Sequence, residues 1–324
     1  MLVFFGFMKT LTPKALRKGE TIGLVSPSSH CAYPDKIGLA ISYLEKNGYQ
    51  VKPSRHLNCI DTDPVIADQQ KLHDLHGMFS DPAVKVVLCL RGGSGASRLL
   101  KKIDYSIIAA NPKILVGYSD ITALSLAVFA KTGLISFSGP MLATELYGPT
   151  PYTEEHFWGM ITSPSYALSL QNHPAHPVTC IREGKAEGRL LGGNLSVFSS
   201  MIGTPYLPSL NDSLLFLEDI NEPAYRIDRM LSHLDNAGLL AQSKGVLFGQ
   251  FGNHAENTKE ENLRQQHIFK YYSDHANIDG PVMRGLSYGH IKNLMTIPVG
   301  ARVKMELSAA GDFSLGALHP VIDA

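Results

Sequence analysis

Apolar and polar positions follow one another along the first third of the chain in an order that predicts strands and helices in turn. Short apolar runs occur in "TIGLV", "VKVVLCL", "ILVG" and "LISFSG", which begin at residues 21, 84, 114 and 134. Between them lie segments with helical spacing, such as "PDKIGLAISYLEKNGY" and "ADQQKLHDLHGMFSDP". Continuously apolar strands that alternate with helices are typical of a parallel sheet covered on both faces. In such sheets ligands bind beyond the carboxyl ends of the strands.

This pattern is lost after residue 147, where "YGPTPYTEEHF" and "QNHPAHPV" are rich in proline and polar residues. We interpret residues 151–186 as an interdomain connection. It separates an N-terminal α/β domain, residues 8–150, from a strand-rich C-terminal domain, residues 187–324.

The C-terminal part contains one clear helix and one clear hairpin. The apolar run "DSLLFLEDI" leads into "EPAYRIDRMLSHLDNAG", where Ile227, Leu231 and Leu234 fall on one helical face. Farther on, "ARVKMEL" alternates with a period of two, and "SAAGDFSLGAL" completes the predicted hairpin.

Composition narrows the class of protein. A chain of 324 residues with 44% hydrophobic and 18% charged residues is an ordinary globular protein with room for two domains. Lys plus Arg and Asp plus Glu are both 29, and no basic run exceeds two residues. This balance argues against a nucleic acid partner, because phosphate binding needs clustered cations.

The cysteines and the apolar segments indicate a cellular compartment. The four cysteines show no CxxC spacing, which favours free thiols in a reducing compartment. The N-terminal "MLVFFGFMKT" lacks a charged region and a cleavage site, so we interpret it as a short extension upstream of a start at Met8. No segment approaches the roughly 18 apolar residues of a membrane span. The sequence therefore predicts a cytoplasmic protein without a membrane segment.

The stretch "ILVGYSDITALSLA" passes from a strand into a helix without a loop. A turn of this kind strains the backbone of its central residue, here Ser119, and aims its side chain beyond the sheet edge. The hydroxyl is then exposed as a nucleophile, and the amide of Asp120 can stabilise an oxyanion. The motif G-x-S-x-I lacks the second glycine of the hydrolase elbow. The alternative that Ser119 only caps the helix therefore stays open.

A second candidate is the glycine block "LRGGSGASRLL". Gly92, Gly93 and Gly95 follow an apolar strand and precede a helix, so their amides can approach a ligand closely. The block is neither a Walker loop nor a GxGxxG fingerprint, which leaves a nucleotide-phosphate site unsupported. A second oxyanion amide from Gly92 or Gly93 is the simpler interpretation.

A serine nucleophile needs a base and an orienting acid. Glu218 ends the apolar run "SLLFLED", and His290 lies in the glycine-containing turn "LSYGHIKN". His73 and His76 are spaced to share a metal, but no third ligand is near, and we expect no metal and no cofactor. Cys89 lies inside an apolar run, where a buried structural thiol is expected.

Five blocks together resemble one family. "RGGSGASRLL", "VGYSDITAL", "GGNLSVFSSMIGTPYLP", "LEDINEPAYRIDRML" and "GHIKN" occur in the order found in the LD-carboxypeptidases, serine peptidases that include the microcin C self-immunity peptidases. The resemblance implies Ser119 as nucleophile, Glu218 as orienting acid and His290 as general base. It also implies an oxyanion hole made by the amides of Asp120 and Gly93.

The resemblance further implies a fold, an assembly and a substrate. The N-terminal domain should resemble class I glutamine amidotransferases, and the protein should form a homodimer. The reaction implied is release of the terminal D-alanine from murein tetrapeptides during cell-wall recycling. The family often has an aromatic residue where this chain has Ser94, which leaves the contact of the site wall with the substrate open.

Two assignments concern substrate recognition. A free C-terminal carboxylate requires a cation, for which Arg91 is the candidate, although Arg91 can equally pair with a neighbouring acid. A peptidase for acyl-adenylate antibiotics is the alternative function, and it needs an aromatic residue to stack on a base. Trp158, the only tryptophan, can serve there or can simply pack. A second alternative is a catalytically silent peptide-binding protein, although such a protein would not require the serine, the glutamate and the histidine together.

Overall fold

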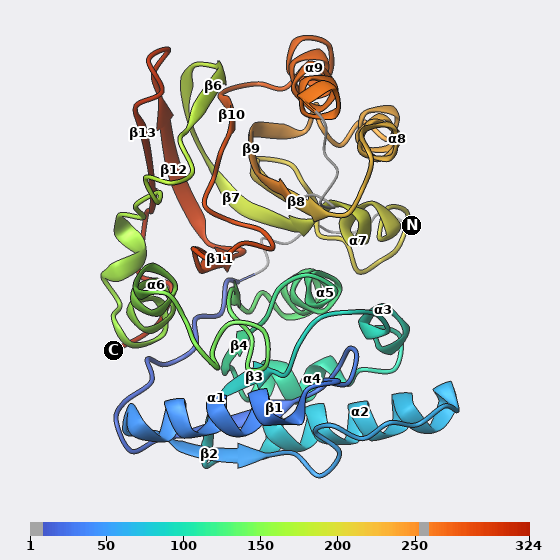
Figure 1. Ribbon diagram of the computed structural model, residues 1–324, viewed down its shortest axis with the longest axis vertical. Helices are drawn as coiled ribbons and strands as arrows, with labels where there is room; N and C mark the ends of the chain where they lie inside the picture. The colour runs from blue at the N-terminus through green and yellow to red at the C-terminus, as the bar shows by residue number, and fades with distance from the viewer. Residues whose placement is uncertain (1–8, 253–258) are drawn as a thin grey trace.

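Two β-sheets, one above the other in Figure 1, form the framework of the protein. The computed structural model describes residues 9–252 and 259–324. The first sheet has the strand order β11-β5-β4-β3-β1-β2, in which β1 to β5 are parallel and β11 runs antiparallel to β5. The parallel sheet expected for the N-terminal half is confirmed. Its strands are β1 (Thr21–Val25), β2 (Gln50–Pro53), β3 (Val84–Cys89), β4 (Ile114–Val116), β5 (Ser136–Ser138) and β11 (Ile297–Val299).

The second sheet has the order β13-β12-β7-β8-β9-β10-β6. Strands β7 to β10 are parallel, while β6 pairs antiparallel with β10, and β12 with both β7 and β13. The predicted hairpin is therefore present as β12 and β13. The strands are β6 (Thr179–Arg182), β7 (Gly184–Asn194), β8 (Ser213–Ile220), β9 (Ser243–Gly252), β10 (Val282–Arg284), β12 (Arg302–Leu307) and β13 (Phe313–Ala317).

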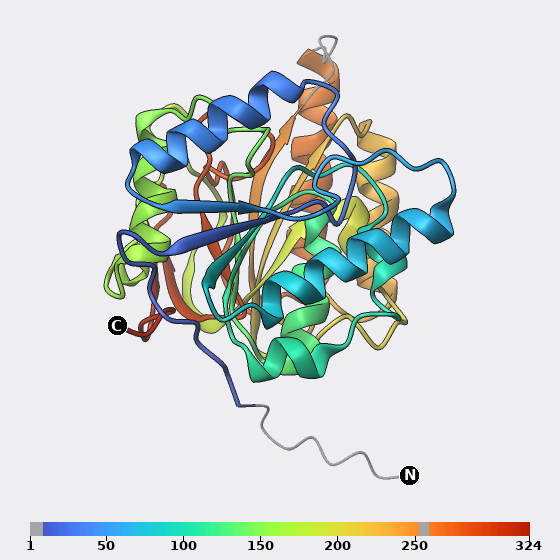
Figure 2. The same ribbon diagram turned by 90° about the horizontal axis from the view of Figure 1, so that it is seen from below.

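Helices flank both sheets, as Figures 1 and 2 show from two sides. In the first half α2 packs on β1 and β3, and in the second half α7 packs on β7 and β8. The helices are α1 (Pro34–Lys46), α2 (Pro64–Ser80), α3 (Ala96–Leu99), α4 (Tyr105–Ala110), α5 (Ile121–Thr132), α6 (Pro151–Thr162), η1 (Tyr166–Leu168), α7 (Leu195–Ser200), α8 (Ala224–Asn236) and α9 (Lys259–His275).

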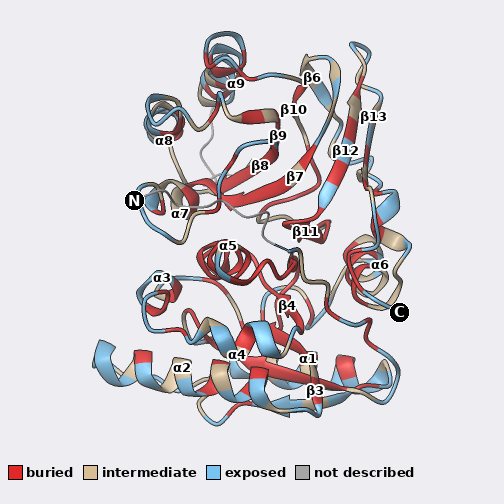
Figure 3. Cartoon of the chain, turned by 180° about the vertical axis from the view of Figure 1, so that it is seen from behind, coloured by how far each residue is buried: buried red, intermediate tan, exposed pale blue. Residues whose placement is uncertain are grey.

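Helix α5 lies between the two sheets and contacts β5 of the first and β7 of the second. Ten of its 12 residues are buried, so its sequence is apolar on every side instead of on one stripe. Figure 3 shows this burial, together with the buried strands of both sheets. The turn of Ser119 and Asp120 directly precedes α5 and is therefore held at the junction of the two halves.

Three features differ from the sequence pattern. The segment 151–186, interpreted as an interdomain connection, contains α6, η1, β6 and the start of β7. The C-terminal half is not simply strand-rich, because its four parallel strands alternate with α7, α8 and the 17-residue α9. Strand β11 leaves the second half and joins the edge of the first sheet. Met8, the expected start, lies outside the described residues.

Within the described residues, no helix combines the length and the apolar character that crossing a membrane requires.

Candidate active site

Ser119 occupies the turn between β4 and α5, and its backbone φ is +63°. This left-handed conformation costs a non-glycine residue on the order of 1–3 kcal/mol, and such strain is typical of functional sites. Helix α5 begins at Ile121 with Asp120 as its N-cap residue, and no side chain caps it. The interpretation of Ser119 as a helix cap is therefore wrong. The strained turn expected from the sequence is present.

The hydroxyl of Ser119 instead donates to the imidazole of His290. Ser119 Oγ and His290 Nε2 are 3.1 Å apart, and His290 Nδ1–H donates to Glu218 Oε2 at 2.9 Å. Glu218 belongs to β8 and is fully buried, whereas His290 lies in the loop between β10 and β11. The carboxylate fixes the tautomer of the imidazole and leaves Nε2 to accept the serine proton. The structure thus brings together the three residues that the sequence nominated.

Two glycines make room for this arrangement. Gly289 has φ +135°, and a Cβ at that position would lie 3.2 Å from Glu218 Oε2. A Cβ at Gly92 would lie 2.8 Å from Ser119 Cβ and 2.9 Å from Ser119 Oγ. Real Cβ atoms rarely approach other atoms this closely, so both positions require glycine.

The charge of the site raises the pKa of His290. Burial alone lowers this pKa, but the hydrogen bond and the negative charge of Glu218, helped by Glu145 and Asp219, outweigh burial. The ring of Tyr118 packs against the imidazole with centroids 5.0 Å apart, and the Tyr118 hydroxyl donates to Glu145 Oε1 at 2.7 Å. Burial raises the pKa of Glu145 to about 7. Two carboxyl groups therefore favour the protonated base: Glu218 by a hydrogen bond and by its charge, and Glu145 by its charge.

Asn194 connects Glu218 to α5, the helix that follows Ser119. No role was assigned to Asn194 from the sequence. Its Nδ2 donates to Asp219 Oδ1 at 2.8 Å and to Glu218 Oε1 at 3.3 Å. Its backbone N–H donates to Thr122 Oγ1 in the first turn of α5 at 3.0 Å. Burial, followed by the charge of Glu218, raises the pKa of Asp219 to about 6. The only signal in the sequence was the place of Asn194 after two glycines in "GGNLSVF".

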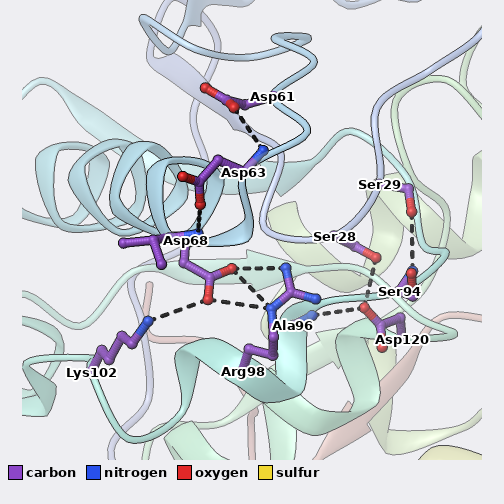
Figure 4. Close-up of polar contacts among 11 residues, drawn as sticks. Ser28, Ser29, Asp61, Asp63, Asp68, Ser94, Ala96, Arg98, Lys102 and Asp120 are labelled. Atoms are coloured by element: carbon purple, nitrogen blue, oxygen red, sulfur yellow. Dashed lines mark hydrogen bonds and ion pairs between the residues drawn. The ribbon is translucent and has the colours of Figure 1, made fainter.

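The carboxylate of Asp120, the residue after the nucleophile, joins the loop that follows β1 to the start of α3, as Figure 4 shows. Asp120 Oδ2 accepts from the hydroxyl of Ser28 at 2.7 Å and from the backbone N–H of Ala96 at 2.9 Å. The backbone N–H groups of Asp120 and Gly93 donate to no acceptor in the part of the chain that the structure describes. Their role as the oxyanion hole stays a prediction, and so does that of Gly92, the other glycine that the sequence proposed, which lies against Ser119.

Ser94 and Arg91 flank the glycine block. The backbone N–H of Ser94 donates to Ser29 Oγ at 3.1 Å and closes the block against the loop after β1 (Figure 4). The guanidinium of Arg91 donates to the carbonyls of Gly92 and His30 at 3.1 and 3.5 Å. Across residues 9–252 and 259–324 it forms no ion pair, so the alternative that it pairs with an acid is wrong. Its proposed contact with substrate stays a prediction.

The remaining candidates have structural roles. Cys89 is fully buried, which raises the pKa of its thiol far above the usual range. His76 Nε2 accepts from the backbone N–H of Asp104 at 3.0 Å, and His73 is exposed beside His56. No group of three or more His, Cys, Asp or Glu side chains that could hold a metal occurs among the described residues.

Three cavities lie beside elements of the site, and the triad residue His290 lines one of them, the Tyr118 cavity. The Tyr118 cavity, of about 500 Å³, is lined among others by Tyr118, Glu145, His290 and Lys292. The Arg284 cavity, also about 500 Å³, is lined among others by Gln250, Gln265, Arg284 and Ile291. The Lys71 cavity, about 170 Å³, is lined among others by Ser28, Ser29, Asp61 and Lys71.

Comparisons with known proteins match most of the chain to one family. The model of the LD-carboxypeptidase N-terminal domain matches residues 22–139, and that of the LD-carboxypeptidase C-terminal domain matches residues 187–305. A probable murein peptide carboxypeptidase of Bacillus subtilis is 38% identical over 92% of this chain and 92% of its own.

Solved structures are similar along nearly the whole chain. An MccF-like protein from Bacillus anthracis matches with a TM-score of 0.83 and 31% identity, covering 96% of this chain and all of its own. A muramoyltetrapeptide carboxypeptidase from Oxalobacter formigenes matches with a TM-score of 0.79 and 30% identity, covering 93% of this chain and 99% of its own. The mixed α/β architecture with two sheets is shared with these structures.

Proposed function

The chain belongs to the LD-carboxypeptidase family, and from this premise we propose that it is a serine carboxypeptidase acting on murein tetrapeptides. The reaction is hydrolysis of the bond between the L-centre of the diamino acid and the terminal D-alanine. One observation carries the proposal: the hydrogen-bonded chain from Ser119 through His290 to Glu218.

The geometry assigns each residue a step. His290 Nε2 takes the proton of Ser119 as Oγ attacks the scissile carbonyl, and Glu218 stabilises the imidazolium that forms. The oxyanion is received by the amides of Asp120 and Gly93. His290 then returns the proton to the nitrogen of the departing D-alanine. Water, deprotonated by the same histidine, cleaves the acyl-enzyme and regenerates the hydroxyl.

The similarity to the MccF-like structure supports one alternative, a peptidase for acyl-adenylate antibiotics. That substrate requires an aromatic surface for its base. Trp158 stacks on Tyr49 with centroids 4.8 Å apart, and its Nε1–H donates to the hydroxyl of Tyr43 at 2.8 Å. Trp158 lines none of the three cavities. Its packing role favours the murein peptide over the adenylate.

Several finer statements accompany the proposal. The family resemblance supports a cytoplasmic homodimer in cell-wall recycling and an N-terminal domain like class I glutamine amidotransferases. The proposed domains are 8–150 and 187–324 with a connection at 151–186, which agrees with the separation of the two matched ranges.

Mass spectrometry of substrates incubated with the purified protein tests the choice between the two functions. One reaction contains murein tetrapeptide and the other an aminoacyl-sulfamoyl adenylate at the same concentration. We expect tetrapeptide to lose one alanine at a far higher kcat/KM than that for adenylate cleavage. Preferential cleavage of the adenylate would replace the proposed function with the alternative, and cleavage of neither would favour the peptide-binding protein.

A further inference from the structure

Arg284, at the end of β10, is a half-buried cation without a partner among the described residues. Its guanidinium forms no hydrogen bond and no ion pair with any residue that the structure describes. Burial is the sole cause of the lowered pKa of this side chain, so no neighbouring acid compensates for the lost hydration. A partly desolvated arginine is costly unless an anion pairs with it. The absence of such a partner points to a ligand.

The surroundings of Arg284 suit an anion. The described residues that line the Arg284 cavity include no aspartate and no glutamate. Amide side chains line it instead, and Gln265 among them is only 7% exposed. A guanidinium fork and amide N–H groups are the donors that a carboxylate accepts from. The amide side chains of the cavity are Gln250, Asn262, Gln265 and Gln266.

The cavity shares a wall with the loop that carries the base. Ile291, which lines it, directly follows His290. Gln250 lines it as well, and Gln250 Nε2 donates to the carbonyl of Leu286 at 3.0 Å. The backbone N–H of Gln250 donates to the carbonyl of Tyr288 at 2.8 Å. A peptide held with its scissile bond at the triad therefore has this cavity beside it.

The other two cavities hold negative charge of their own. Glu145 lines the Tyr118 cavity beside His290. Asp61 lines the Lys71 cavity, where Asp68 and Asp120 also act on the charge of Lys71. In either place a second carboxylate would meet this negative charge, despite the cations Lys292 and Lys71 of the same linings. The Arg284 cavity is the one of the three whose described lining carries a cation and no acid.

We propose that the Arg284 cavity is a carboxylate subsite of the substrate cleft and that Arg284 binds the carboxylate. The inference rests on the proposed function, since it names the part of the peptide that this cavity recognises. Two carboxylates of a murein tetrapeptide share the required chemistry: the C-terminal one of the departing D-alanine, and one upstream of the scissile bond.

Three peptides distinguish these sources: the free tetrapeptide, its C-terminal amide, and a form with its upstream carboxylates amidated. Each is assayed with the wild type, Arg284→Gln, Arg284→Lys and the control Arg302→Gln. Arg302 is an exposed arginine of the same sheet and forms no ion pair in the described part of the chain. Circular dichroism establishes that every variant is folded.

On the free tetrapeptide we expect Arg284→Gln to lower kcat/KM by about 10- to 100-fold, mainly through KM, as for loss of a hydrogen bond between charged groups. Arg284→Lys should recover part of the loss, and Arg302→Gln should match the wild type. On the peptide that lacks the bound carboxylate, the wild type should fall to the level of Arg284→Gln. An equal loss on all three peptides, or no loss, would overturn the assignment.

Binding without turnover separates this result from a failure of the proposed function. Calorimetry with Ser119→Ala and with the double variant Ser119→Ala, Arg284→Gln compares tetrapeptide affinities directly. A lower affinity of the double variant supports the subsite even if the wild type hydrolyses no peptide. Equal affinities overturn the subsite even if hydrolysis is fast.

Discussion

Replacing Glu218 with glutamine removes the charge behind the base and keeps the shape of the side chain. The carboxylate is fully buried and accepts from His290 Nδ1–H at 2.9 Å and from Asn194 Nδ2–H at 3.3 Å. The single carbonyl oxygen of a glutamine cannot serve both donors, and it no longer stabilises an imidazolium. Weakening a buried, hydrogen-bonded ion pair costs about 3–5 kcal/mol. Because the imidazolium forms in the transition state, kcat/KM should fall roughly 150- to 5,000-fold.

The assay is release of D-alanine from murein tetrapeptide as a function of pH, with thermal unfolding as the measure of folding. Glu222→Gln is the matched control, because the Glu222 carboxylate pairs with Arg226 and not with the triad. The control should stay within about twofold of the wild type, as surface pairs contribute little. Glu218→Gln should also move the acid limb to lower pH, since Glu218 raises the pKa of His290. A loss below tenfold in the folded variant, or an unmoved acid limb, would refute this reasoning.

Four further outcomes are expected. A base must be neutral, so wild-type kcat/KM should rise with pH through a midpoint above about 6.5, the ordinary histidine value. Glu145→Gln should lower that midpoint, because the charge of Glu145 also raises the pKa of His290; an unchanged pH profile would contradict this influence of Glu145. Asn194→Ala should reduce kcat/KM by about tenfold or more and lower the thermal midpoint, because it leaves the buried carboxylates of Glu218 and Asp219 without their common donor. Wild-type kinetics would exclude a role of Asn194 in positioning Glu218. Gly192→Ala should lower the free energy of unfolding, measured by chemical denaturation, by about 2 kcal/mol or more. The reason is that φ of Gly192 is +146° and that a Cβ there would overlap the backbone of β8. Unaltered stability would show that the strands separate easily there.

The elements predicted from sequence were those with strong local signals. Strands β1, β3 and β4 are buried on both faces, so their sequences are continuous apolar runs. Helix α8 was equally clear, because its apolar residues Ile227, Leu231 and Leu234 fall on one face. In each of these elements the local pattern and the tertiary environment agree.

The elements that were missed lack such a pattern. Helix α6 begins with Pro151 and is capped by Thr150, and its proline-rich start is typical of a loop as well as of a first helical turn. Helix α9 buries only a few of its 17 residues, among them Phe269 and Tyr272, so its polar sequence shows no wide apolar face. The pairing of β11 with β5 joins residues far apart in the chain, which no local pattern encodes.

The site was predictable in part. The turn at Ser119 follows from the adjacency of strand and helix, whereas the choice of Glu218 and His290 among many acids and histidines came from the family resemblance. Neither the local sequence pattern nor the family resemblance indicated Asn194 or Arg284. Asn194 matters through contacts that exist only after β7 meets α5, and Arg284 because its guanidinium has no partner among the residues that the structure describes.

The central claim is that Ser119 is the nucleophile of a murein L,D-carboxypeptidase. The most direct test is mass spectrometry of murein tetrapeptide after incubation with the wild type and with Ser119→Ala. We expect loss of one alanine with the wild type and a rate lower by roughly four orders of magnitude or more with the folded variant. Comparable hydrolysis by the two proteins, or no loss of alanine with either, would contradict it.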